Sequence, residues 1–98
     1  MKILFMGDGK WGELSLKELL KQDENIIGVV IRTNPSDDGC PILAQKYNIP
    51  LFQPDDINSD NFFNEVKKLD PDIIVSMSYD QIIGHRLINF PKEGIINV

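Results

Sequence analysis

Short continuous apolar runs alternate along this chain with segments whose apolar residues recur every three or four positions. Apolar runs without an interleaved polar face are typical of strands that helices cover on both faces. Apolar residues spaced three or four apart are typical of amphipathic helices. The two patterns predict strands at about 3–6, 26–31, 49–52, 72–78 and 94–98, with helices at about 10–22, 41–47, 59–69 and 82–89.

This alternation predicts a single α/β domain over residues 1–98. We expect a Rossmann-like, doubly wound parallel sheet of about five strands with helices on both faces. The simplest strand order is 3-2-1-4-5, in which residues 49–52 form an edge strand because Pro50 cannot donate to a ladder. The loops after the first and fourth strands then face each other across a crevice. Residues 94–98 are expected to form a short buried strand.

Charge and composition narrow the classes of function. The formal net charge is −5, which does not favour non-specific binding of nucleic acid. Cys40 is the only cysteine and His85 the only histidine, so this chain can form no intrachain disulfide and no metal site based on cysteines or histidines. We expect His85 on the surface. The amino terminus contains no signal-peptide core and no membrane span, so a cytoplasmic location without a membrane partner is expected.

A glycine-rich turn after the first predicted strand permits several interpretations. Residues 7–12 match G-x-G-x-x-G at a strand-to-helix junction, which can cradle a pyrophosphate. A dinucleotide site also needs an acidic residue after the second strand, where Arg32 stands instead and could meet the extra phosphate of NADP. The glycines could also serve the backbone angles of a tight turn. If the helix start binds another substrate, the candidate contacts are Gly7, Asp8, Gly9, Lys10 and Trp11.

One amide side chain, that of Asn97, stands at the predicted carboxyl end of the last strand. Side chains at this edge of a parallel sheet face the crevice, and a carboxamide there can donate a hydrogen bond to a developing oxyanion. Asn97 is therefore a candidate catalytic residue. From the residue type alone, a buried structural asparagine is the simpler explanation.

Several segments together resemble the 10-formyltetrahydrofolate-dependent formyltransferases, and the resemblance runs through the whole chain. It rests on residues 1–7, on residues 47–54 with the sequence Tyr-Asn-Ile-Pro-Leu-Phe-Gln-Pro, and on residues 71–75. The most specific part is Tyr-Asp-Gln-Ile-Ile at 79–83, followed by Asn97 within Gly-Ile-Ile-Asn-Val. The resemblance implies transfer of a formyl group from 10-formyltetrahydrofolate to a primary amine, without a metal.

The resemblance also implies roles for individual residues. In that family the loop after the fourth strand binds the pterin ring of the folate, largely through backbone groups. The asparagine of an Asn-x-His motif matches Asn97, whose amide would stabilise the oxyanion, whereas His85 does not align with the motif's histidine. This histidine and a later aspartate have no counterpart here, so we expect the amino-terminal half of a catalytic domain, truncated after strand five and inactive alone. The implied folate-binding residues are Tyr79, Asp80, Gln81, Ile82 and Ile83.

The acceptor amine is the least constrained part of this interpretation. Residues 7–12 depart from the Gly-Thr-Pro sequence of methionyl-tRNA formyltransferases, and the acidic balance favours a nucleotide-linked amino sugar over methionyl-tRNA, with glycinamide ribonucleotide third. Nucleic acid is then a partner only if the acceptor is tRNA. An uncovered last strand would present a free edge, so we expect self-association. The competing interpretation is an NADP-binding or regulatory Rossmann-like module without catalysis.

Overall fold

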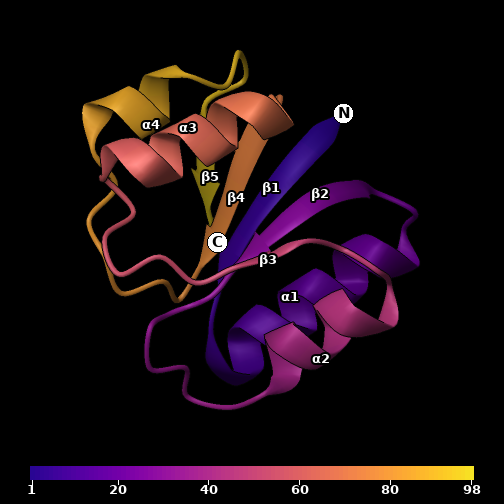
Figure 1. Ribbon diagram of the computed structural model, residues 1–98. Coiled ribbons are helices and arrows are strands. Elements are labelled where there is room, and N and C mark those ends of the chain that lie inside the picture. The colour runs from indigo at the N-terminus through magenta and orange to yellow at the C-terminus, as the bar shows by residue number, and fades with distance from the viewer.

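The computed structural model describes residues 1–98, and strands and helices alternate in the predicted order (Figure 1). The strands are β1 (Lys2–Gly7), β2 (Asn25–Val30), β3 (Leu51–Phe52), β4 (Ile73–Met77) and β5 (Ile95–Asn97). The helices are α1 (Gly9–Lys21), α2 (Gly39–Lys46), α3 (Asp60–Leu69) and α4 (His85–Asn89).

The five strands form one parallel sheet in the order β3-β2-β1-β4-β5, which confirms the predicted doubly wound layout. The direction of winding reverses between β1 and β4, where Gly7 lies opposite Met77. The backbone N–H of Asp8 donates to the carbonyl of Met77 at 3.2 Å, one step beyond this pair. The loops after β1 and β4 therefore leave the sheet next to each other, at the edge where ligands bind in open α/β sheets.

The apolar side chains of the sheet divide between two buried clusters, one under each pair of helices. Successive residues of a strand point to opposite faces, so Ile3 and Phe5 of β1 pack beneath α1 and α2, whereas Leu4 and Met6 join the cluster beneath α3 and α4. Figure 1 shows these helix pairs on opposite sides of the sheet. The continuous apolar run of β1 therefore reflects a strand covered on both faces.

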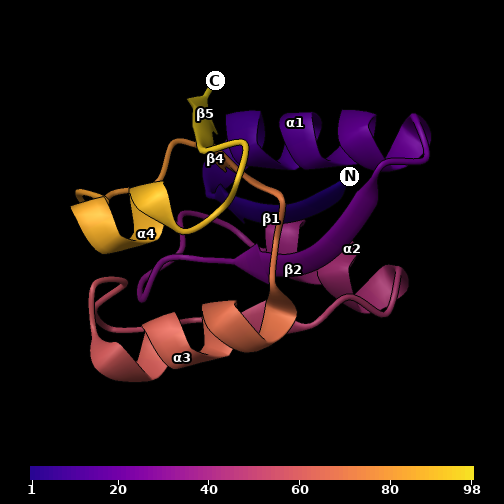
Figure 2. The ribbon, with the colours of Figure 1, turned by 90° about the horizontal axis from the view of Figure 1, so that it is seen from above.

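Three predicted elements differ in extent or burial. β3 is limited to Leu51 and Phe52, and α4 begins at His85 instead of residue 82. The prediction of a buried last strand is wrong, because Ile96 is 51% exposed and Val98 63% exposed. β5 is an edge strand, and the helices on the α1 side of the sheet do not extend over it (Figure 2).

Cys40 lies where α2 packs against α1 and is only 2% exposed. A side-chain carbon at Gly12 would lie 3.4 Å from the Cys40 sulfur, so the glycine allows the two helices to approach closely. Burial raises the pKa of the Cys40 thiol to about 12, and the nearby carboxylates of Asp37, Asp8 and Glu13 act in the same direction. The thiol is therefore uncharged at neutral pH.

Candidate active site

Two glycines shape the turn between β1 and α1, one through its backbone conformation and the other by allowing the helix to pack closely against the strand. Gly9 has a φ of +69°, a left-handed conformation that glycine adopts at little cost. A side-chain carbon at Gly12 would come within 3.2 Å of the Gly7 backbone, so α1 can lie this close to β1 only with glycine there. Lys10 and Trp11 project from the first turn of α1 into solvent, and Trp11 is 67% exposed.

The Asp8 carboxylate points away from the helix start and makes no capping hydrogen bond to it. Its Oδ1 accepts from the Ser36 N–H at 2.8 Å, and its Oδ2 lies 2.8 Å from Nη1 of Arg32. Burial alone would raise the pKa of Asp8, but the hydrogen bonds from Ser36 and Arg32 outweigh burial and hold this pKa below its ordinary value. The side chain of Asp8 is 3% exposed, so its contribution to a substrate site would be indirect.

Arg32 follows β2 and lies between two carboxylates. Besides Asp8, it faces Asp80 in the loop after β4, with Nε 3.1 Å from Oδ2. The hydrogen bond to Asp8 raises the pKa of the guanidinium, as does the contact with Asp80. A cation already shared by two carboxylates is a poor receptor for the extra phosphate of NADP, which weakens the dinucleotide interpretation.

The predicted folate loop, residues 79–83, has no regular secondary structure but is fixed by hydrogen bonds to other segments. Tyr79 reaches across the sheet edge and donates its hydroxyl to the Ile31 carbonyl at 3.0 Å. Gln81 accepts from the Ile57 N–H at 2.8 Å and donates to the Asp55 carbonyl at 3.1 Å. Loop residues therefore connect to the ends of β2 and to the segment between β3 and α3.

Asn58 holds the far end of the same loop. Its Nδ2 donates to the Ile82 carbonyl at 2.9 Å, and its Oδ1 accepts from the Gly84 N–H at 2.7 Å. Neither Asn58 nor Ser36 was among the residues that the sequence patterns predicted for the site. Their positions in the sequence could have indicated them, because both residues lie in segments that follow strands and therefore reach the carboxyl edge of the sheet.

Burial raises the pKa of the Tyr79 hydroxyl to about 12, and the Asp80 carboxylate adds to the effect, while Arg32 opposes it. The phenol is therefore protonated at neutral pH and remains a hydrogen-bond donor to Ile31. Tyr79 contributes to the core beneath α3 and α4 through its ring. Its side chain thus helps to fix the loop at the residue that follows Ser78.

Asn97 is the last residue of β5 and lies opposite Ser76 of β4. It is exposed, and the neighbouring Val98 N–H donates to the Ser76 carbonyl at 2.8 Å, which fixes the strand tip. The alternative of a buried structural asparagine is therefore wrong. From the spacing of adjacent strands, Asn97 lies about 10 Å from Gly7, on the opposite side of β4.

Two grooves are open on the surface. An apolar groove of about 350 Å³ lies between the start of α1 and the tip of β5, with Trp11, Leu14, Val75 and Val98 in its walls. Figure 2 shows the carboxyl terminus beside the first turn of α1. This groove brings Trp11 near the strand that carries Asn97. Asn97 itself does not line the groove: it pairs with Ser76, on the face of the sheet that α3 and α4 cover, whereas Val75 and Val98 face α1.

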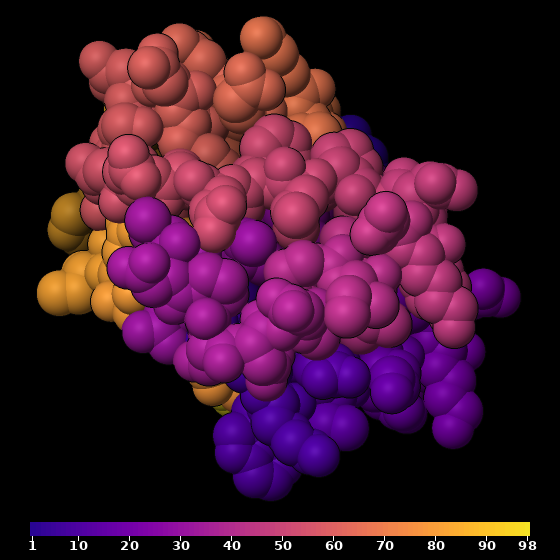
Figure 3. All heavy atoms as spheres, turned by 60° about the horizontal axis from the view of Figure 1, so that its bottom comes forward, coloured from indigo at the N-terminus to yellow at the C-terminus, as the bar shows by residue number.

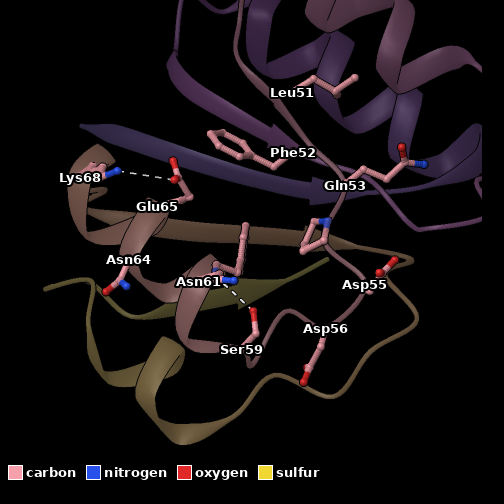
Figure 4. Close-up of a pocket in the computed structure, with 12 residues that line it drawn as sticks. Leu51, Phe52, Gln53, Asp55, Asp56, Ser59, Asn61, Asn64, Glu65 and Lys68 are labelled. Atoms are coloured by element: carbon pink, nitrogen blue, oxygen red, sulfur yellow. Dashed lines mark hydrogen bonds and ion pairs between the residues drawn. The ribbon is translucent and has the colours of Figure 1, made fainter.

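A second, more polar groove of about 700 Å³ runs between β3, the segment that follows it and α3 (Figure 4). Polar side chains such as Asp55, Asp56 and Glu65 line it, and Lys68 lies 3.6 Å from Glu65. None of the predicted site residues contributes to its walls. We therefore place the candidate site at the loops after β1, β4 and β5 and not in this larger groove.

His85 is exposed at the start of α4, as predicted. No cluster of three or more histidine, cysteine, aspartate or glutamate side chains is arranged to hold a metal ion. None of the four helices is both long and apolar enough to cross a membrane.

Curated relatives align with the whole chain. It is 37% identical to the methionyl-tRNA formyltransferase of Sulfurihydrogenibium sp. (strain YO3AOP1) and 36% identical to that of Alkaliphilus oremlandii (strain OhILAs). All of this chain is covered, but it spans only 34% of the length of each relative. No family model matches the chain.

The fold is shared with a solved enzyme structure. The crystal structure of glycinamide ribonucleotide transformylase 1 from Geobacillus kaustophilus superposes with a TM-score of 0.68 at 22% identity, covering 99% of this chain and 57% of that one. This structural likeness shows the fold alone. The similarity to formyltransferases in sequence comes from the curated relatives. Along its whole length the chain is therefore similar to formyltransferases, as the resemblance in its motifs predicted.

Proposed function

We propose that this chain forms the folate loop and the oxyanion-stabilising part of an enzyme that transfers a formyl group from 10-formyltetrahydrofolate to a primary amine. The observation that carries the proposal is the exposed Asn97 at the carboxyl end of β5, one strand from a fixed loop at residues 79–83. The similarity of the whole chain to curated formyltransferases supports the same reaction.

In this reaction a C–N bond forms between the acceptor amine and the formyl carbon, and the bond from that carbon to N10 of the folate breaks. The carbonyl oxygen becomes negatively charged in between, and Nδ2 of Asn97 would donate a hydrogen bond to it. The backbone groups of residues 79–83 would bind the pterin ring and so hold the formyl carbon in place. The proton lost by the amine needs an acceptor, which by resemblance is a histidine outside these residues.

We expect the 98-residue chain to show no turnover, because it supplies an oxyanion donor and a folate loop but no evident proton acceptor for the amine. Formation of tetrahydrofolate from 10-formyltetrahydrofolate in the presence of an amine, followed spectroscopically, tests this. Turnover by the isolated chain, at a rate proportional to its concentration, would contradict the proposal that the proton acceptor lies outside these residues.

The acceptor is proposed to be an amino sugar linked to a nucleotide. The exposed Lys10 and Trp11 beside Val98 offer a cation and an aromatic face for a phosphate and a ring, and the start of α1 is not capped by Asp8. The net charge of −5 is also unfavourable for a tRNA. The names of the curated relatives support the rival acceptor, methionyl-tRNA.

Steady-state assays with each candidate acceptor in turn distinguish between the possible substrates. The complete enzyme is supplied with 10-formyltetrahydrofolate and, in separate reactions, with a nucleotide-linked amino sugar, methionyl-tRNA or glycinamide ribonucleotide. We expect the largest kcat/KM with the sugar. Formylation of methionyl-tRNA alone would end the sugar proposal and leave formyl transfer itself standing. Absence of formyl transfer to every amine would contradict the proposed function.

A further inference from the structure

Arg32 leaves β2 between the two loops that the proposed function uses. Its Nη1 lies 2.8 Å from Oδ2 of Asp8, in the turn after β1, and its Nε lies 3.1 Å from Oδ2 of Asp80, in the loop after β4. Figure 3 shows the segment after β2 packed beside the segment after β4 on the surface. One cation therefore joins the loops on either side of the switch point.

The two ends of this bridge are not equally firm. The Asp8 carboxylate is 3% exposed and is fixed by the Ser36 N–H as well as by Arg32. The Asp80 carboxylate is 42% exposed and has Arg32 as its ion-pair partner. Asp8 therefore holds the guanidinium in one orientation, which places Nε of Arg32 3.1 Å from the Asp80 carboxylate as an ion pair.

A second contact lies directly beside the first. Ile31 accepts the Tyr79 hydroxyl at 3.0 Å, so two consecutive residues after β2 hold two consecutive residues after β4. We call Ile31, Arg32, Tyr79 and Asp80 the β2–β4 clasp. Two adjacent contacts fix both the place and the direction of a chain segment, which a single contact cannot do.

Stability alone does not account for the Arg32–Asp80 half of the clasp. Ion pairs with an exposed partner contribute little to stability, and salt screens them. The loop that Asp80 belongs to has no ladder hydrogen bonds, and the residue before Tyr79, Ser78, has a φ of +60°. What the ion pair changes is therefore the position of the loop backbone.

We propose that Arg32 is a positioning residue for the folate site, which acts through Asp80 to hold the backbone of residues 79–83 in the conformation that binds the pterin ring. This inference rests on the proposed function. A loop that is ordered before binding loses less conformational freedom when the ligand arrives, so its affinity is higher. Arg32 need not touch the folate to have this effect.

The first test uses the 98-residue chain without ligand. Asp80→Ala breaks the Arg32–Asp80 contact and leaves the buried Asp8–Arg32 pair in place, so the fold is preserved. We expect the backbone ¹⁵N order parameters of Gln81 and Ile82 to fall from about 0.85 to below about 0.6. Glu24→Gln removes an equally exposed charge far from the loop and should change neither value. Unaltered order parameters in Asp80→Ala would overturn the positioning role.

The second test uses the complete enzyme and separates KM from kcat. We expect Asp80→Ala and Arg32→Met each to raise the KM for 10-formyltetrahydrofolate about tenfold, with kcat changed less than about twofold. Arg32→Lys should lie between them and the wild type, because a single ammonium cannot face both carboxylates as the guanidinium fork does. A fall in kcat at constant KM would overturn the proposal.

The first test does not depend on the proposed function, whereas the second does. A wild-type enzyme that transfers no formyl group would overturn the proposed function and the folate role of Arg32. The order parameters of the unliganded chain would still decide whether Arg32 orders the loop.

Discussion

The loop after β4 and the strand β5 both reach the carboxyl edge of the sheet, but they are held there by different means. The loop has no secondary structure, yet contacts with two other segments, the one after β2 and the one between β3 and α3, fix residues 79–84. β5 has regular ladder hydrogen bonds to β4 but exposes Ile96 and Val98. Regular backbone pairing and anchoring by side chains are therefore separate properties, because the loop is held by specific contacts although Ile82 within it is 89% exposed.

This difference predicts different responses to substitution. Changes at the tip of β5 should alter chemistry and leave stability alone, because little is packed against it. Changes at the anchors of the loop should first alter stability and local order. Four substitutions, described from the largest expected effect to the smallest, test this contrast.

Asn97→Ala should have the largest effect, and only on activity. Loss of an oxyanion donor lowers kcat roughly 10²- to 10³-fold in the complete enzyme. Because Asn97 is exposed, the free energy of unfolding should change by no more than about 0.5 kcal/mol. Steady-state kinetics and urea unfolding measure the two quantities. Asn89→Ala, an exposed position on α4, is the control, and full activity in Asn97→Ala would remove Asn97 from the catalytic machinery.

Asn58→Ala should destabilise the loop. It removes the hydrogen bonds to the Ile82 carbonyl and from the Gly84 N–H, which we expect to cost about 1–2 kcal/mol. Hydrogen exchange at the Gly84 amide should accelerate, whereas amides of β1 should keep their protection. Asn61→Ala is a matched control, because Asn61 is exposed on the adjacent helix α3. Equal exchange rates in both variants would mean that Asn58 does not anchor the loop.

Tyr79→Phe removes the hydrogen bond to Ile31 and should cost about 0.5–1.5 kcal/mol at neutral pH. The pKa of Tyr79 is raised to about 12 in the folded protein, so its contribution is fully present below the unfolded value of 10 and is lost as pH rises towards 12. The stability difference between wild type and Tyr79→Phe should therefore shrink between pH 10 and 12.

The control for this pH dependence is Tyr47→Phe, since Tyr47 is 48% exposed and lies outside the site. Unfolding in denaturant at several alkaline pH values measures both variants. A difference between wild type and Tyr79→Phe that is constant across this range would contradict the assigned role of the phenol.

Ile96→Lys should have the smallest effect on the fold, within about 0.5 kcal/mol, because the side chain is half exposed on an edge strand. Its effect should appear in association, since a lysine on a free edge opposes pairing with another strand. Sedimentation velocity should show the wild-type chain associating with concentration and the variant less so. Identical sedimentation at all concentrations would show that the edge does not mediate contacts between copies.

Sequence patterns predicted the sheet because its burial is a local property of each strand. The run Ile3 to Met6 has no polar position, and in the structure both of its faces are covered. The same pattern misled at Ile96, where an apolar residue in a strand has no helix above it. A run of apolar residues shows that a strand can be buried, but the presence of a covering element depends on the rest of the fold.

The connections within the site could not be predicted in this way. The Asp8–Arg32 pair joins residues 24 positions apart, and Tyr79 reaches Ile31 over 48 positions. Such pairs depend on which loops the strand order places side by side and on rotamers at their ends. The motif at 79–83 therefore indicated a candidate loop at the sheet edge, but not that Arg32 and Asn58 contact it.

The buried Cys40 gives this protein an internal reporter of motion. Thiol reagents attack only the thiolate, and this thiol is both shielded between α1 and α2 and held protonated, with a pKa of about 12. The Cys40 thiol of the native chain can therefore be alkylated only when α1 and α2 separate. As the chain has no other cysteine, the labelling rate at increasing urea would measure how often that layer opens, without any introduced probe.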